Sequence, residues 1–289
     1  THDARFVLKW PFTEILFIKG AASIRNDRNV TLATDISSLK EPNTFDTWGG
    51  FTGELVFDNT IKKGLNLYNG TRTKLFAEWF KQVDEEQTNL FVIGFDWRNY
   101  LKLNRDIIWA NRLATSTSFG DQKLVYYMGG VDGWLKPAFD NDIDIAQDQN
   151  YAYQTLATNM RGFDQNIRNG NSFAVINSEI RFPIFKYFTK KPMKSDFLKN
   201  FQIVPFADIG TAWTGPNPYT QDNSFNTDNI QTGPITIRLT RQREPIVAGY
   251  GMGLRTRIWG YFIRVDWARG IEDGMILDPM IYWSLNLDF

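Results

Sequence analysis

The stretch Phe91–Tyr100, FVIGFDWRNY, decides the fold class, because apolar and polar side chains alternate along it. Large apolar side chains occupy every second position: Phe91, Ile93, Phe95 and Trp97. Asp96 lies between Phe95 and Trp97, Arg98 follows Trp97, and both would face the other side of an extended strand. Helical spacing would scatter these charges around the helix, so the pattern predicts a β-strand with one apolar and one polar face.

Similar segments recur along the whole chain, and we count about eleven predicted strands. They are residues 4–10, 14–30, 53–59, 72–83, 91–100, 107–119, 172–185, 201–213, 245–258, the region around 263–267, and 281–289. No segment shows a convincing helical period. Several strands place two or three charges on the polar face, which is too many for a dry sandwich core. A water-filled or polar-packed lumen accommodates them, so the sequence predicts a barrel.

The composition fits a transmembrane antiparallel β-barrel. Among 289 residues there are 23 Phe, 11 Tyr and 10 Trp, which together make 15% of the chain. The mean hydropathy is −0.35, and no apolar run approaches the roughly 18 residues of a membrane helix. Barrel strands alternate lipid-facing and lumen-facing residues, so their mean hydropathy resembles that of a soluble protein. A soluble, aromatic-rich β-sandwich is the alternative that composition alone leaves open.

Charge and residue usage exclude several functional classes. Lysine plus arginine equals aspartate plus glutamate, 32 against 32, so no net positive field attracts nucleic acid. The chain has no cysteine and a single histidine, His2. It therefore lacks the residues needed for thiolate ligation, for zinc chemistry and for histidine-based nucleophilic catalysis. We therefore expect no cofactor, no nucleic-acid partner and no enzymatic activity.

The strand count leads to an expectation about domain organisation. Bacterial single-chain barrels have an even number of strands, with long extracellular loops and short periplasmic turns. Placing the long loops outside makes the last strand end in the periplasm and the first predicted strand begin at the extracellular side. We therefore expect residues 1–289 to form the C-terminal part of one outer-membrane barrel, with N-terminal strands and any periplasmic domain missing.

The motif Met160-Arg161-Gly162-Phe163 stands near the end of a long polar segment, residues 129–171. Glycine lets the backbone turn or approach another chain closely, and arginine offers a planar fork of donors to a buried carboxylate. Their position predicts a long extracellular loop that folds back into a cavity.

Further motifs accompany this one along the chain. They are Gly129-Gly130, Glu179-Ile180-Arg181-Phe182-Pro183, Phe206-Ala207-Asp208-Ile209-Gly210 followed by Trp213, and the terminal aromatic Phe289. In this order and spacing the chain resembles the outer-membrane assembly and translocation barrels of the BamA, TamA and two-partner secretion type, the bacterial surface antigen family. The resemblance covers nearly the whole chain. It departs in having Met160 where valine is usual, and about thirty residues between Gly130 and Arg161.

The resemblance implies a role for particular residues. The chain would supply roughly the sixth to sixteenth strands of a sixteen-stranded barrel. Arg161 would reach into the lumen and pair with Asp208, with Glu179 as the second candidate. Phe206 and Gly210 would belong to the strand motif beside it. Trp283 and Phe289 would mark the last strand, which carries the insertion signal and lines the seam of the barrel.

The function implied is the insertion or translocation of other proteins at or across the outer membrane of a Gram-negative bacterium. Expected partners are outer-membrane lipid, unfolded or exported client proteins, and accessory lipoproteins or periplasmic subunits. The alternative is a passive channel, or a structural barrel that anchors a periplasmic or surface domain, because a barrel can keep its bracing loop after losing its clients.

An acidic loop provides a weaker candidate for a metal site. Its carboxylates are Asp140, Asp142, Asp144 and Asp148. The loop has Ile145 where an EF-hand needs its sixth-position glycine, and Tyr151 where it needs a glutamate. A solvated acidic loop is the favoured interpretation, and we predict no metal.

Overall fold

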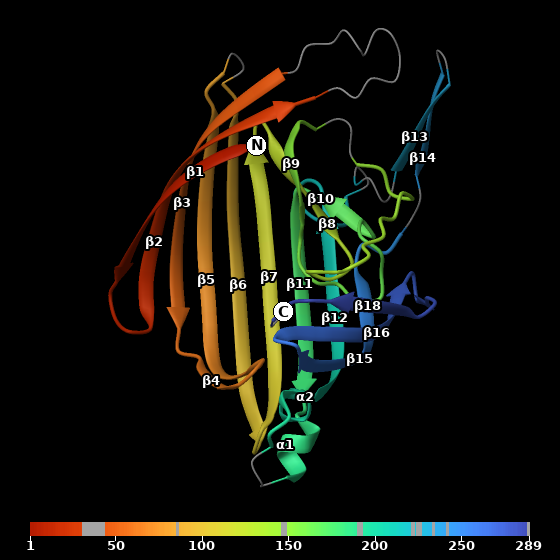
Figure 1. Ribbon diagram of the computed structural model, residues 1–289. Coiled ribbons are helices and arrows are strands. Elements are labelled where there is room, and N and C mark those ends of the chain that lie inside the picture. Colours follow the sequence, from red (N-terminus) through yellow and green to blue (C-terminus); the bar gives the residue numbers. More distant parts are fainter. Residues whose placement is uncertain are drawn as a thin grey trace.

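Antiparallel β-strands make up most of the computed structural model (Figure 1). The structure describes residues 1–30, 44–84, 87–145, 149–189, 193–220, 223, 227–232, 235–240 and 243–287. The main sheet follows the order of the chain through β1 (His2–Pro11), β2 (Leu16–Asn29), β3 (Thr44–Asp58), β5 (Leu67–Gln82), β6 (Asn89–Asn104), β7 (Ile107–Gly120), β11 (Ser172–Arg181), β12 (Gln202–Trp213), β15 (Val247–Ile258) and β16 (Tyr261–Glu272). The predicted all-β, antiparallel fold is confirmed.

The end of the main sheet is formed by two short strands, β17 (Met275–Ile276) and β18 (Met280–Ser284), which both pair with β16. The short β4 (Ile61–Gly64) pairs with β5. Counting β18 with the ten strands of the ordered run gives eleven, and each corresponds to one of the predicted strands. The sheet is curved but does not close on itself, since β1 forms one edge and β17 and β18 form the other.

The alternation seen in the sequence separates the two faces of the sheet. In β6, Val92 is buried on the concave face, whereas Phe91 is exposed on the convex face. Aromatic rings on the convex face stack across four neighbouring strands, with successive centroids 6.0, 6.4 and 5.5 Å apart. They belong to Phe51, Trp79, Phe91 and Phe119. Such an exposed aromatic row is typical of the interfacial girdle of an outer-membrane barrel.

The structure corrects several predicted boundaries. The predicted strand 172–185 ends at Arg181, because Pro183 cannot donate a ladder hydrogen bond and the following residues form the helix α1 (Ile184–Phe188). A second short helix, α2 (Asp196–Asn200), begins where the Ser195 hydroxyl accepts a hydrogen bond from the backbone N–H of Leu198. The sequence shows no convincing helical period here, since each of these helices has only five residues. Neither helix has the length or apolar character to cross a bilayer.

Two connections that the sequence suggested as loops contain further strands. The hairpin of β13 (Thr227–Thr232) and β14 (Ile235–Thr240) lies between β12 and β15. The connection between β7 and β11, which includes the long polar segment, contributes a three-stranded sheet of β8 (Lys123–Met128), β9 (Tyr151–Leu156) and β10 (Arg168–Gly170). Figure 1 shows this small sheet beside β11 and β12, at the end of the molecule opposite α1 and α2.

The largest buried cluster lies where the long segment packs on the concave face of the main sheet. Its members come from β7, β8, β11, β12, β15 and the returning chain: Ala114, Tyr126, Met128, Met160, Phe163, Ile167, Phe173, Val175, Ala212 and Val247. Two residues of the sequence motif, Met160 and Phe163, are thus part of the core. The loop therefore lies against the sheet, and its arginine is held at the lumen side.

Candidate functional site

The base of the long loop is closed by backbone hydrogen bonds between its two ends. The Gly130 N–H donates to the Phe163 carbonyl at 3.0 Å, and the Met160 N–H donates to the Gly130 carbonyl at 3.0 Å. Gly129 has φ +126°, and a Cβ at that position would lie 1.9 Å from the Asp164 carbonyl oxygen. Only glycine fits such a left-handed backbone at this distance. The Gly129-Gly130 pair therefore fixes the motif against the start of the loop.

Arg161 lies at the centre of the site and is 1% exposed. Its guanidinium donates through Nε and Nη2 to the two carboxylate oxygens of Asp208, both at 2.7 Å. The third nitrogen, Nη1, donates to Glu179 Oε1 at 2.7 Å, and the Arg161 backbone N–H donates to Asp208 Oδ2 at 3.2 Å. Because arginine stays protonated in proteins, this is a fully desolvated ion pair in fork geometry.

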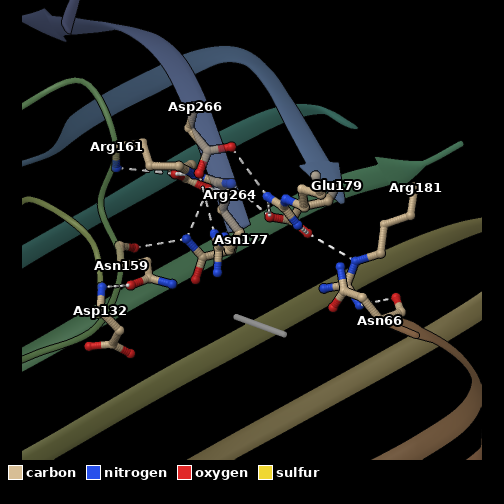
Figure 2. A network of polar contacts seen from close by, with 11 residues as sticks. Asn66, Asp132, Asn159, Arg161, Asn177, Glu179, Arg181, Arg264 and Asp266 are labelled. Atoms are coloured by element: carbon tan, nitrogen blue, oxygen red, sulfur yellow. Dashed lines mark hydrogen bonds and ion pairs between the residues drawn. The ribbon is translucent and has the colours of Figure 1, made fainter. Parts of the chain in front are cut away.

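The two carboxylates belong to a larger buried network on the concave face (Figure 2). Glu179 accepts hydrogen bonds from both Arg181 and Arg255, at 2.9–3.0 Å. Asp266 accepts longer contacts of 3.4 Å from Arg255 and Arg264. Side chains that meet here come from β11, β12, β15, β16 and the loop, and all are 0–1% exposed. The loop arginine thus bonds to β11 and β12, and Arg255 extends the network from Glu179 to β15 and β16.

Register explains why these residues meet. Asn177 of β11 pairs with Asp208 of β12, and Asp208 pairs with Gly249 of β15. The Asn177 side chain donates to Asp208 Oδ1 at 2.8 Å and to the Asn159 carbonyl of the loop at 2.9 Å. Period-two alternation places every second residue of these strands on the concave face. Charged residues at those positions therefore gather in one layer beneath the loop.

Glycines on the concave face make room for the motif. A Cβ on Gly249 would lie 1.9 Å from the Arg161 carbonyl oxygen, and one on Gly270 would lie 2.5 Å from the Phe163 ring. Gly162 itself has φ +100° and approaches the backbone of β16. The Arg161 guanidinium stacks on the Phe206 ring, with 3.6 Å between its central carbon and the ring centroid. Glycine therefore permits backbone contact on one side, and an aromatic ring supports the cation on the other.

Tyr282 of β18 joins the motif to the last strand. Its hydroxyl donates to the Phe163 carbonyl at 2.8 Å and accepts from the Gly162 N–H at 2.8 Å. The side chain is fully buried. The buried Gly162 N–H needs this partner, and the Phe163 carbonyl accepts from both Tyr282 and Gly130. The loop that carries Arg161 therefore also holds the edge strand of the sheet.

The structure brings some of the predicted residues together and separates others. Arg161, Asp208, Glu179 and Phe206 are in contact, and Gly210 packs under Met128 and Val175. Trp283 points to the convex face and is 54% exposed, whereas Phe289 lies outside the described residues. Tyr282, Arg255 and Asp266 also belong to the site, although the sequence motifs do not include them. The sequence of β15 contains a pattern that could have located the site: Gly249, Gly251 and Gly253 occupy every second position, and all three lie on the concave face.

The acidic loop does not assemble a metal site among the residues described. Asp140 accepts a hydrogen bond from the Asp142 N–H at 2.8 Å, which is a local turn contact. Asp144 contributes only its backbone carbonyl, which accepts from Asn169, and Asp148 falls outside the described residues. No group of three metal-ligating side chains occurs in the described part of the chain. Burial, together with the negative charge of Asp140, raises the pKa of the Asp164 carboxyl.

Comparison with known proteins identifies the family and the fold. The sequence matches the Omp85 superfamily domain over residues 1–273. The structure is similar to a crystal structure of BamA from Haemophilus ducreyi lacking POTRA domains 1–3, with a TM-score of 0.56 and 13% sequence identity. The similar region covers 98% of this chain and 53% of that chain, so the sequence spans about half of its length. No curated protein matches the sequence.

Proposed function

The chain belongs to the Omp85 superfamily, and on that premise we propose that residues 1–289 belong to an outer-membrane barrel that assists insertion or translocation of other proteins. The observation that carries the proposal is the returned loop. It buries Arg161 between Asp208 and Glu179 and binds Tyr282 of the last strand through the neighbouring residues of the same motif. A loop with both contacts can brace the barrel wall and position the strand at its edge.

The proposed mechanism uses the edge of β18 and needs no cofactor or catalytic residue. An edge strand presents unpaired backbone donors and acceptors, which can template the pairing of an incoming strand. Of the predicted seam residues, Trp283 belongs to this strand, and Phe289 lies outside the described residues. A client strand would pair with this edge while the ion network keeps β11, β12, β15 and β16 in register. The energy for the step comes from hydrogen bonds and apolar burial of the client.

The surfaces of the sheet suggest the partners. Exposed apolar side chains cover the convex face, including Phe51, Trp79 and Ile93, and support contact with outer-membrane lipid. The charged concave face would meet unfolded or exported client proteins. We propose accessory lipoproteins or periplasmic subunits as further partners, at the end that carries α1 and α2. The outer membrane of a Gram-negative bacterium is the proposed location.

Depletion of the protein in its own cell, followed by quantitative outer-membrane proteomics, tests this proposal. We expect other barrels or surface proteins to fall in level, and the wild-type protein to restore them. Arg161→Glu should fail to restore them, because it places a third negative charge against Asp208 and Glu179. Arg72→Glu is the matched control, since Arg72 carries the same charge but its side chain is 43% exposed. The amount of each variant in the outer membrane is measured in parallel.

A different outcome would favour the second function. If every other outer-membrane protein keeps its level after depletion, client handling is refuted. The barrel would then be tested as a passive channel or as an anchor for a periplasmic or surface domain, first by conductance across planar bilayers.

A further inference from the structure

The outer edge of β18 is already paired with a piece of the long loop. On one side β18 pairs with β16 over five residue pairs. On its other side the Leu135 N–H donates to the Trp283 carbonyl at 2.9 Å, and the Leu285 N–H donates to the Gly133 carbonyl at 3.2 Å. Trp134 and Ser284 form an antiparallel bridge between these bonds. Residues 133–135, which we call the edge strap, therefore lie where an added strand would lie.

Side-chain contacts on the concave face hold the edge strap in place. The Trp134 ring meets the Tyr282 ring edge-on, with 4.9 Å between centroids and 62° between planes. Both rings adjoin the buried cluster that contains Val131 and Phe206. Gly133 has φ +66°, so the chain enters the strap through a left-handed residue that glycine adopts without strain. The strap is therefore seated on the same tyrosine that binds the motif.

A chain of polar contacts connects the edge strap to the ion network. The backbone N–H of Asp132, next to the strap, donates to Asn159 Oδ1 at 2.6 Å. The Asn159 carbonyl accepts from Asn177, whose amide also donates to Asp208. Figure 2 shows Asp132 and Asn159 at the edge of the network around Arg161. The position of the strap thus depends on the loop that Arg161 anchors.

We propose that the edge strap is a resident competitor at the outer edge of β18, and that an incoming antiparallel strand displaces the strap before it pairs with β18. The partner that fits is a strand with a large apolar or aromatic side chain opposite Ser284, because that side chain would take the place of Trp134 on Tyr282. Two backbone hydrogen bonds hold the strap, so a longer strand that follows β18 along its length makes more bonds and replaces it. This inference rests on the proposed function and names a control step in it.

An engineered disulfide tests whether the strap occupies the edge. Residues 1–289 contain no cysteine, so Trp134→Cys with Ser284→Cys introduces a single cysteine pair into this part of the protein. Residues that face each other between flanking hydrogen bonds have close Cβ atoms, which suits a disulfide. We expect most of the full-length protein in outer membranes to cross-link with copper phenanthroline. In the control pair, Trp134→Cys with Ile281→Cys, the second thiol lies on the convex face and cross-linking should be slight. Equal cross-linking of the two pairs would overturn the proposal.

Capture of a peptide tests whether the strap competes with an added strand. The probe is a synthetic peptide of residues 129–137 with cysteine at the position of Trp134, offered to the full-length Ser284→Cys protein. Adding Leu135→Pro removes the N–H that donates to the Trp283 carbonyl, and adding Leu135→Ala keeps it. We expect disulfide capture of the peptide to rise roughly fivefold with proline, the change that follows loss of one net hydrogen bond. It should stay unchanged with alanine.

The results separate the two proposals. Equal capture by the proline and alanine variants means that the strap does not compete, and the inference fails whatever the depletion experiment gives. Because peptide capture does not depend on client levels in the cell, a failure of the proposed function leaves this measurement intact. Weaker capture by the proline variant than by the alanine variant would also refute competition.

Discussion

The two halves of the sheet carry similar charges on the concave face but bury them to very different degrees. In the first half, Lys19 and Glu54 pair at 3.1 Å with side chains 33% and 15% exposed. In the second half, Arg161 and Asp208 pair at 2.7 Å with side chains 1% and 0% exposed. The first pair joins two adjacent strands directly, whereas the second needs a residue from a distant loop. The alternation of the strands is the same in both halves.

The strand pattern places charges on the concave face in both halves, and in the second half the loop adds the arginine that completes the buried network. Exposed pairs contribute little, because water and salt screen them. A buried pair also adds little compared with an apolar substitute, but removing one partner leaves a desolvated charge and is strongly destabilising. The second half is therefore sensitive to single substitutions in a way that the first half is not. Substitutions matched between the halves can test this contrast.

Arg161→Ala should give the largest effect. It leaves Asp208 without its fork of donors and removes one of the cations around Glu179. We expect the free energy of unfolding to fall by about 3–5 kcal/mol. The measurement is urea unfolding of the protein in lipid vesicles, followed by tryptophan fluorescence. A loss below about 1 kcal/mol would mean that water already reaches Asp208 and that the network is not desolvated.

A pair of glycine substitutions should sharpen the contrast between the halves. A methyl group on Gly249 would overlap the Arg161 carbonyl, so Gly249→Ala should destabilise by about 1–3 kcal/mol through displacement of the loop. A methyl group on Gly20 of β2 would have no atom within 4 Å, so Gly20→Ala should be neutral or slightly stabilising. Unfolding of both variants in vesicles provides the comparison. Equal effects would show that the loop does not lie against β15.

Lys19→Ala should have the smallest effect. The pair with Glu54 is partly exposed, and its loss should change the free energy of unfolding by about 0–1 kcal/mol. High salt should reduce even this difference, since added ions screen a partly exposed pair. The check is the unfolding midpoint of wild type and variant at low and high salt. A loss as large as that of Arg161→Ala would remove the distinction between the two halves.

The strands could be predicted from the sequence because period-two alternation is a local property. The predicted ends of strands were wrong where the local sequence resembled a turn. The predicted strand 53–59 is too short, since β3 starts at Thr44 and continues through Gly49 and Gly50, which resemble a turn in the sequence. Gly50 instead makes room for the Phe80 ring, which would lie 2.5 Å from a Cβ at this position. The glycine is needed because of a side chain on the neighbouring strand β5, which the sequence around Gly50 does not reveal.

The candidate site could be predicted from the sequence only in part, for a similar reason. The resemblance suggested Asp208 and Glu179 as partners for Arg161, and the structure places both within 2.7 Å of the guanidinium. Nothing in the sequence around Tyr282 indicates its role. That role depends on two backbone groups of a loop 119 or 120 residues away along the chain. Contacts of that kind depend on the register of four strands and on the path of the loop. Composition and spacing do not encode either of them.

The closed neck of the long loop has a consequence for how this protein can vary. The backbone of Gly130 forms hydrogen bonds with both Met160 and Phe163. The part of the loop between Gly130 and Met160 is therefore a side branch whose two ends are already joined. Lengthening such a branch changes only the entropy of ring closure, by about 0.6 kcal/mol for each doubling. The exposed turn near Asp142 is therefore a place where an epitope, or a whole folded module, can be inserted while Arg161 keeps its position.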